Sequence, residues 1–143
     1  MDEALLSLGR DPVSAEVPQG TSARYEPEYE AVQAEIGKLQ SVSAEPVDWE
    51  EVVSLASVIL REKSKDLQIA CQLTLGLFRT RGLEGLRVGL VVCRDLVERF
   101  WETMFPELRR LRARVAAVEW MAEQASKIFE KQKHGPRDVE ILR

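Results

Sequence analysis

Residues 64–82 read SKDLQIACQLTLGLFRTRG, residues 83–106 continue as LEGLRVGLVVCRDLVERFWETMFP, and this stretch decides the fold. Apolar side chains recur in it every three or four positions, which is the spacing of one face of an α-helix. The basic turn before Gly82 is typical of a helix end, and Pro106 stops the second apolar run. The stretch therefore predicts two helices joined at Gly82, the first capped by Ser64 and the second running from about residue 83 to residue 104.

The two cysteines are informative about the geometry of that turn. Cys71 lies 11 residues before Gly82 and Cys93 lies 11 residues after it. An antiparallel hairpin would place both about 16 Å from the turn, so we expect them to be neighbours in the core. They are interpreted either as two small buried hydrophobic side chains or as a redox pair, and a reducing cytosol favours the first interpretation.

Helical spacing extends outward from this stretch. A short helix is predicted at residues 2–8, followed by an extended arm at residues 11–26 that contains proline and glycine. Pro27 begins a further helix, Asp48 caps one that runs to about Glu62, and a last helix covers residues 107–131. The apolar stripes expected to be buried are Tyr25, Tyr29, Val32, Ile36 and Leu39; Trp49, Val52, Val53, Ala56, Ile59 and Leu60; Leu86, Leu90, Cys93, Val97, Phe100 and Met104; and Leu111, Val115, Val118, Ala122, Ala125 and Phe129.

No segment shows the alternating pattern of a β-strand. The predicted fold class is therefore all-α, a bundle of about five to six antiparallel amphipathic helices with an extended Pro/Gly-containing N-terminal arm. We expect residues 1–26 to form the short helix and the arm, packed on the bundle of residues 27–132 as one domain. Residues 133–143 are expected to be a tail or a truncated linker.

The composition argues against several classes of function. The 143 residues carry a net charge of −4, with −8 in residues 1–50 and +4 in residues 51–143, so only a local patch could attract nucleic acid. No apolar run is long enough to span a membrane and the N-terminus lacks a basic start, which predicts a cytoplasmic protein. With His134 as the single histidine and no glycine-rich phosphate loop, we expect no metal, no cofactor and no enzymatic activity.

Six short motifs follow one another along residues 11–122. They are PVS at 12–14 with PQG at 18–20 and RYEPEY at 24–29; DW at 48–49; SKDLQIA at 64–70; GLEGL at 82–86; WETMFP at 101–106; and RVAAVEWM at 114–121. This set resembles the ImpA N-terminal domain family, which begins the TssA-type proteins of the bacterial type VI secretion system. The resemblance implies a non-enzymatic cytoplasmic organiser that contacts baseplate, tail-tube or sheath components during tail assembly.

The chain also departs from the family pattern. Residues 107–113, ELRRLRA, are short and basic, whereas the family often has a longer acidic loop at this point. TssA-type proteins usually continue into a middle region and a C-terminal ring-forming domain, so the chain is expected to be either part of a longer protein or a solitary N-terminal domain.

The basic run at the start of the last predicted helix is the first candidate site. Cations there oppose the helix dipole and need partners, and the helix break beside them displays aromatic side chains of the kind that anchor interfaces. Three interpretations stay open: the arginines pair with the acidic first fifty residues, they bind an acidic protein, or they bind nucleic acid. The candidate partner-binding residues are Trp101, Phe105, Arg109, Arg110, Arg112 and Arg114.

The arm is the second candidate, as an intramolecular clasp or a docking site formed by Pro18, Gly20, Arg24 and Tyr25. The function expected from all these features is an interaction domain of a type VI secretion assembly protein. Its expected partners are other secretion components, without nucleic acid or a membrane span, and self-association stays open. The alternatives are an unrelated helical adaptor or regulator and, with less support, a small nucleic-acid-binding helical domain.

Overall fold

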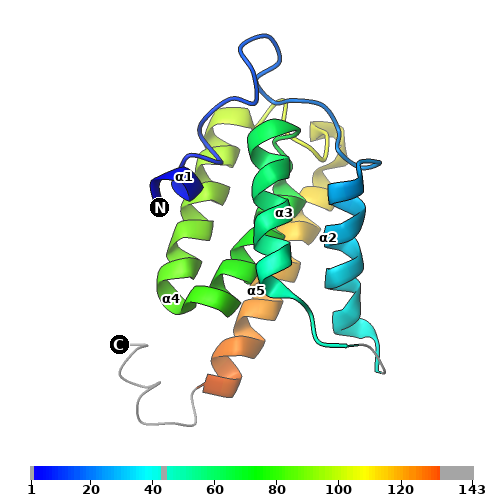
Figure 1. Ribbon diagram of the computed structural model, residues 1–143. Coiled ribbons are helices and arrows are strands. Elements are labelled where there is room, and N and C mark those ends of the chain that lie inside the picture. The colour runs from blue at the N-terminus through cyan, green and yellow to red at the C-terminus, as the bar shows by residue number, and fades with distance from the viewer. Residues whose placement is uncertain (1, 43–44, 133–143) are drawn as a thin grey trace.

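The computed structural model describes residues 2–42 and 45–132, and every regular element in that part of the chain is a helix (Figure 1). The predicted all-α fold is therefore confirmed. The predicted tail at residues 133–143, with His134, lies outside the described residues. The elements are α1 (Asp2–Leu6), α2 (Pro27–Gly37), α3 (Trp49–Glu62), α4 (Leu67–Phe100) and α5 (Leu111–Gln132), with short 3₁₀ turns η1 (Lys38–Gln40) and η2 (Leu108–Arg110).

Helix α4 consists of two arms that meet at Gly82, where the chain reverses (Figure 1). Gly82 has φ +68° and ψ −149°, a conformation that only glycine adopts without strain. Gly89 lets the two arms approach closely, because a Cβ atom there would lie 2.6 Å from Oγ1 of Thr74 on the first arm. The predicted turn at Gly82 is thus confirmed.

The helix caps agree with the prediction at one helix and differ at the next. The Asp48 carboxylate accepts a hydrogen bond from the Glu51 amide at 3.1 Å, as predicted for α3. The predicted cap of α4 at Ser64 is wrong, since Asp66 caps that helix by accepting from the Ile69 amide at 3.1 Å. Ser64 is instead fully buried and lies opposite Gly20 in an isolated β-bridge. Because this linker pairs with the arm, Ser64 and Lys65 stay outside the helix and α4 begins two residues later than predicted.

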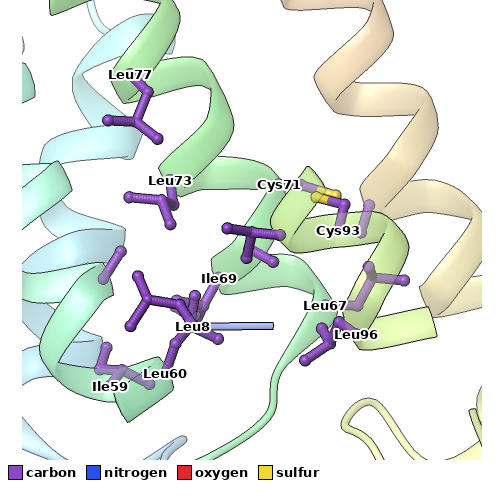
Figure 2. Close-up of a cluster of buried hydrophobic side chains, with 14 of the residues drawn as sticks. Leu8, Ile59, Leu60, Leu67, Ile69, Cys71, Leu73, Leu77, Cys93 and Leu96 are labelled. Atoms are coloured by element: carbon purple, nitrogen blue, oxygen red, sulfur yellow. The ribbon is translucent and has the colours of Figure 1, made fainter. Parts of the chain in front are cut away.

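The core is formed by α1, α2, α3, both arms of α4 and α5 (Figure 2). Leu8, just after α1, is 2% exposed and packs into this core. The sulfur atoms of Cys71 and Cys93 lie next to each other, as the hairpin geometry predicts, and both cysteines are free and buried (Figure 2). The Oγ1 atom of Thr74 lies 3.4 Å from Sγ of Cys93. The hydrogen bond with the Cys93 thiol, and burial as a second cause, raise the pKa of the Cys71 thiol.

The face that α5 buries differs from the predicted one. Leu111, Val115 and Val118 are 49%, 49% and 42% exposed, whereas the buried residues of α5 are Arg114, Ala117, Met121 and Ile128. Both faces of α5 carry apolar residues at helical spacing, so the local pattern does not select between them. Exposed residues in the other predicted stripes are Tyr25, which precedes α2, Leu39 and Leu90. None of the described helices is both long and apolar enough to cross a membrane.

Candidate interaction surface

Three segments that are distant in sequence meet at one end of the bundle. They are the arm at residues 19–21, the linker at residues 63–67 and the loop at residues 101–106. The linker lies between the other two. The Lys65 amide donates to the Gln19 carbonyl at 2.8 Å, and the Thr21 amide donates to the Lys63 carbonyl at 3.0 Å. On the other side, the Leu67 amide donates to the Phe105 carbonyl at 2.7 Å and the Phe105 amide to the Lys65 carbonyl at 2.9 Å.

Gly20 fixes the arm to the linker. Its φ is +70°, and a Cβ atom at this position would lie 2.1 Å from the Lys63 carbonyl oxygen. The structure therefore places Gly20 in an intramolecular clasp, one of the two roles predicted for the arm. The side chains of Pro18, Arg24 and Tyr25 are exposed on the same segment, Tyr25 at 87%.

Arg114 holds the loop in place from inside the protein. It is 2% exposed, and its guanidinium donates to the carbonyls of Pro106 (2.6 Å), Trp101 (2.6 Å) and Met104 (2.9 Å). The same group lies 4.7 Å from the centroid of the Trp101 ring. Because these donors are directed at loop carbonyls, Arg114 does not belong to the exposed basic run in which the sequence pattern placed it.

The other five predicted partner-binding residues, which are wholly or partly exposed, define what we call the aromatic–arginine surface: Trp101, Phe105, Arg109, Arg110 and Arg112. Trp101 is 41% exposed, Phe105 is half-buried and the three arginines are exposed. Arg109 has an ion pair with Glu107 at 3.6 Å. Within the described residues, no salt bridge connects these arginines to the acidic first fifty residues, so the intramolecular pairing considered from the sequence is not found there.

Tyr29 on α2 is influenced by charges from the arm and from the aromatic–arginine surface. Burial raises the pKa of Tyr29, and the charge of Asp66 raises it further, while the charges of Arg24 and Arg110 act in the opposite direction. Arg24 of the arm and Arg110 of η2 are thus the two cations whose charge acts on this phenol. The fold brings residues from both predicted groups to the same end of the bundle.

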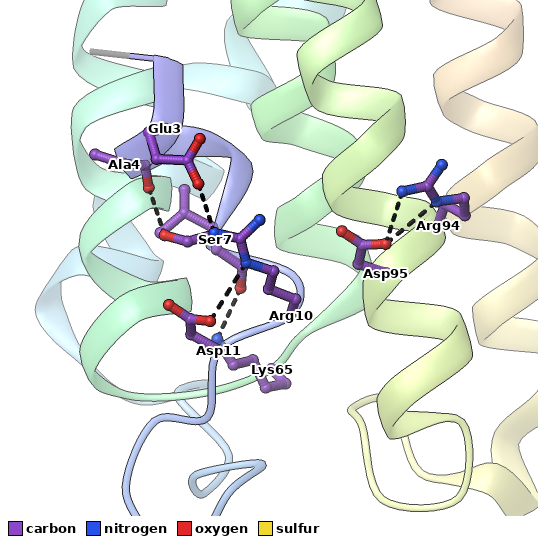
Figure 3. Close-up of polar contacts among 9 residues, drawn as sticks. Glu3, Ala4, Ser7, Arg10, Asp11, Lys65, Arg94 and Asp95 are labelled. Atoms are coloured by element: carbon purple, nitrogen blue, oxygen red, sulfur yellow. Dashed lines mark hydrogen bonds and ion pairs between the residues drawn. The ribbon is translucent and has the colours of Figure 1, made fainter.

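Sequence reasoning missed the role of Lys65, which is 1% exposed. Its ammonium donates to the carbonyls of Leu8 (2.7 Å) and Leu60 (2.8 Å) and lies 5.8 Å from the Phe100 ring centroid. Burial lowers the pKa of Lys65 to about 8, with a smaller opposing effect from Asp11, whose position beside it is seen in Figure 3. The available signal was a lysine directly before the apolar run that begins at Leu67.

The adjacent Asp66 is buried as well, and desolvation raises its pKa to about 6 against the opposing hydrogen bonds from the Ile69 and Gln68 amides. These two buried charges belong to the framework beneath the surface. Among the described residues, no group of three or more His, Cys, Asp or Glu side chains is placed to hold a metal ion.

A groove of about 820 Å³ lies away from this end, between α2, the first arm of α4 and α5. Trp49 and Trp120 line it, and the Arg79 guanidinium lies 5.7 Å from the Trp49 ring centroid. Both tryptophans are half-buried and pack against the core, and Trp49 belongs to a stripe that the sequence predicts to be buried.

Comparison with known proteins gives a consistent result. Over 65 residues, or 46% of this chain, the sequence is 38% identical to the type VI secretion system component TssA1 of Pseudomonas aeruginosa, of which it covers 19%. Among solved structures, it resembles the N-terminal domain including the conserved ImpA_N region of the TssA component of the type VI secretion system from Burkholderia cenocepacia. The TM-score is 0.74 and the identity 28%, covering 90% of this chain and 49% of that one.

The chain thus spans about half of the solved relative and about a fifth of the curated one. Residues 10–123 match the family model described as ImpA, N-terminal, type VI secretion system, which is most of the chain. The chain belongs to the ImpA N-terminal domain family of type VI secretion systems.

Proposed function

We propose that this chain is a non-enzymatic protein-interaction domain of a type VI secretion assembly protein and that it contacts a baseplate, tail-tube or sheath component during tail assembly. Its contact site is the aromatic–arginine surface. The family supports a role in the secretion machine, and the observation that carries the choice of site is Trp101, an exposed aromatic side chain on a loop that Arg114 holds by three hydrogen bonds.

A rigid loop matters because binding then costs little conformational entropy. Trp101 supplies a large apolar contact, and the exposed Arg109, Arg110 and Arg112, on η2 and the start of α5, supply positive charge. Tryptophan and arginine are the residues that most often dominate interface energies. The partner that fits this surface presents an apolar depression for the indole ring with carboxylates around it, since complementary charge speeds association and favours the correct orientation.

The test is a capture experiment with separately purified baseplate, tail-tube and sheath proteins from the same bacterium. We expect the wild-type domain to retain one of them and Arg109→Glu with Arg110→Glu to weaken that binding at least tenfold. The remaining binding should also depend less on salt concentration.

The matched control is Arg61→Glu with Arg81→Glu, which makes the same change in net charge at two exposed positions on α3 and the first arm of α4. This control should bind as the wild type does. Equal binding by both double variants, with far-ultraviolet circular dichroism unchanged, would contradict the proposed site. Salt-dependent retention of DNA in place of any secretion protein would contradict the proposed function.

A further inference from the structure

Most of the exposed large apolar side chains lie in the part of the chain that runs from the second arm of α4 to α5. Ten large apolar residues are exposed in the described part of the chain, and six of them lie on the second arm of α4, the loop after it, η2 and α5. Contiguous apolar groups on a protein surface mark a place where something binds. The six residues are Leu90, Trp101, Leu108, Leu111, Val115 and Val118.

Four residues of this set, together with Ala122, have the spacing of a helix–helix seam. Leu108, Leu111, Val115, Val118 and Ala122 are separated by steps of 3, 4, 3 and 4 residues, and all five are exposed. Such a heptad pattern suits packing against another helix. Within the domain, α5 packs through a different face, formed by Ala117, Met121 and Ile128. The seam is therefore a second apolar face on a helix whose first face is already occupied. We call these five residues the α5 seam.

We propose that the α5 seam binds the α5 seam of a second copy of this chain, with the two helices antiparallel. A two-fold axis between Val115 and Val118 places each of these valines against the other in the second copy, and Leu111 against Ala122. This inference does not require the proposed contact with secretion components, although Arg112 belongs to the aromatic–arginine surface and also borders the seam.

The charges beside the seam favour this occupant and this direction. Arg112 and Glu119 are both exposed on the same edge of the seam, seven residues apart. In the antiparallel pair, Arg112 of one copy faces Glu119 of the other, with an axial offset of about 3 Å, and the symmetry makes this contact twice. A parallel pair would instead bring the two basic starts side by side, including Arg109, Arg110 and Arg112 of each copy, and like charges there repel.

Five side chains form a seam smaller than a standard interface of about 800 Å² per partner, so we expect a dimer with a micromolar dissociation constant. Sedimentation velocity of the 143-residue protein at about 5–300 µM covers this range and tests the proposal. We expect a concentration-dependent dimer. Val115→Glu or Val118→Glu should leave a monomer over the whole range. Ala116→Glu, exposed on the same helix but away from the seam, is the matched control and should dimerise as the wild type does.

Charge exchange tests the direction of the pair. Arg112→Glu alone and Glu119→Arg alone should each weaken the dimer at least tenfold. An equimolar mixture of these two variants should associate, because each mixed pair regains both opposite-charge contacts, and the double variant should recover self-association. A wild-type monomer at about 300 µM would overturn the proposal, because it would exclude a dimer of micromolar affinity. A dimer that survives Val115→Glu and Val118→Glu would also overturn it.

Discussion

Replacing Arg114 by methionine should destabilise the domain by about 3–5 kcal/mol. The substitution removes three hydrogen bonds, at 2.6, 2.6 and 2.9 Å, from a cationic donor to loop carbonyls. Each is worth roughly 1.5–3 kcal/mol. The total is smaller than three independent losses because Trp101 is 41% exposed, so water can reach part of the loop and hydrate the carbonyls.

Urea denaturation followed by far-ultraviolet circular dichroism measures this loss. Two arginine variants make the result specific. Arg114→Lys keeps the positive charge, but a single ammonium cannot reproduce the fork of donors that reaches three carbonyls, so we expect a loss of about 2 kcal/mol. Arg112→Met removes an exposed arginine from the same helix and should change the free energy of unfolding by less than about 0.5 kcal/mol.

The account of Arg114 as the residue that holds the loop would be refuted by a loss below about 1 kcal/mol for Arg114→Met. It would also be refuted if Arg114→Lys were as stable as the wild type, since charge alone would then be sufficient. Equal destabilisation by Arg112→Met would mean that the effect comes from lost charge on α5 and not from the buried contacts.

Three further predictions concern the framework beneath the surface. Gly20→Ala should lower the free energy of unfolding, measured by urea denaturation, by about 2–4 kcal/mol, because it combines a positive φ with a clash against Lys63. Gly37→Ala, where a Cβ atom meets nothing within 4 Å, should be neutral or stabilising, and equal effects of the two substitutions would contradict this prediction. The Lys65 pKa of about 8 lies below the ordinary lysine value of 10.5, so the unfolded chain binds more protons than the folded one between these two values. The free energy of unfolding should therefore rise with pH in this range, by about 3 kcal/mol relative to Lys65→Met, and parallel pH profiles of the two proteins would exclude this effect. The buried free thiols of Cys71 and Cys93 should react with a small thiol reagent only on unfolding, and rapid labelling of both in the native state would disprove their burial.

The features that sequence predicts well are those determined by a few neighbouring residues. The Asp48 carboxylate accepts a hydrogen bond from the amide of Glu51, three residues later, and this contact depends only on residues at the start of the helix. The chain takes a positive φ at residue 82, and a glycine that follows a basic helix turn is a local sequence signal for that conformation. The approach of Cys71 to Cys93 follows from that turn, since two helices of fixed rise must pair residues at equal distances from it.

The features that sequence missed depend on contacts between distant segments. Ser64 is a good helix cap by residue type, but pairing with Gly20 takes it out of the helix and leaves the cap to Asp66. Arg114 stands in a run of arginines, and only the loop at residues 101–106 makes its environment different from that of Arg112. α5 has two apolar faces, and the neighbouring helices decide which is buried. Local periodicity contains no information about these neighbours.

The position of Arg114 allows the two proposed surfaces to be separated. It lies on the inner side of α5 and reaches the loop that carries Trp101, so its loss should loosen the aromatic–arginine surface. The α5 seam lies on a different face of the same helix, and α5 itself is held to the bundle by Ala117, Met121 and Ile128. A folded Arg114→Met protein should therefore lose binding to a secretion component while it keeps its self-association. Because Val115→Glu should have the opposite effects, the two variants together determine whether the domain has two independent surfaces or one.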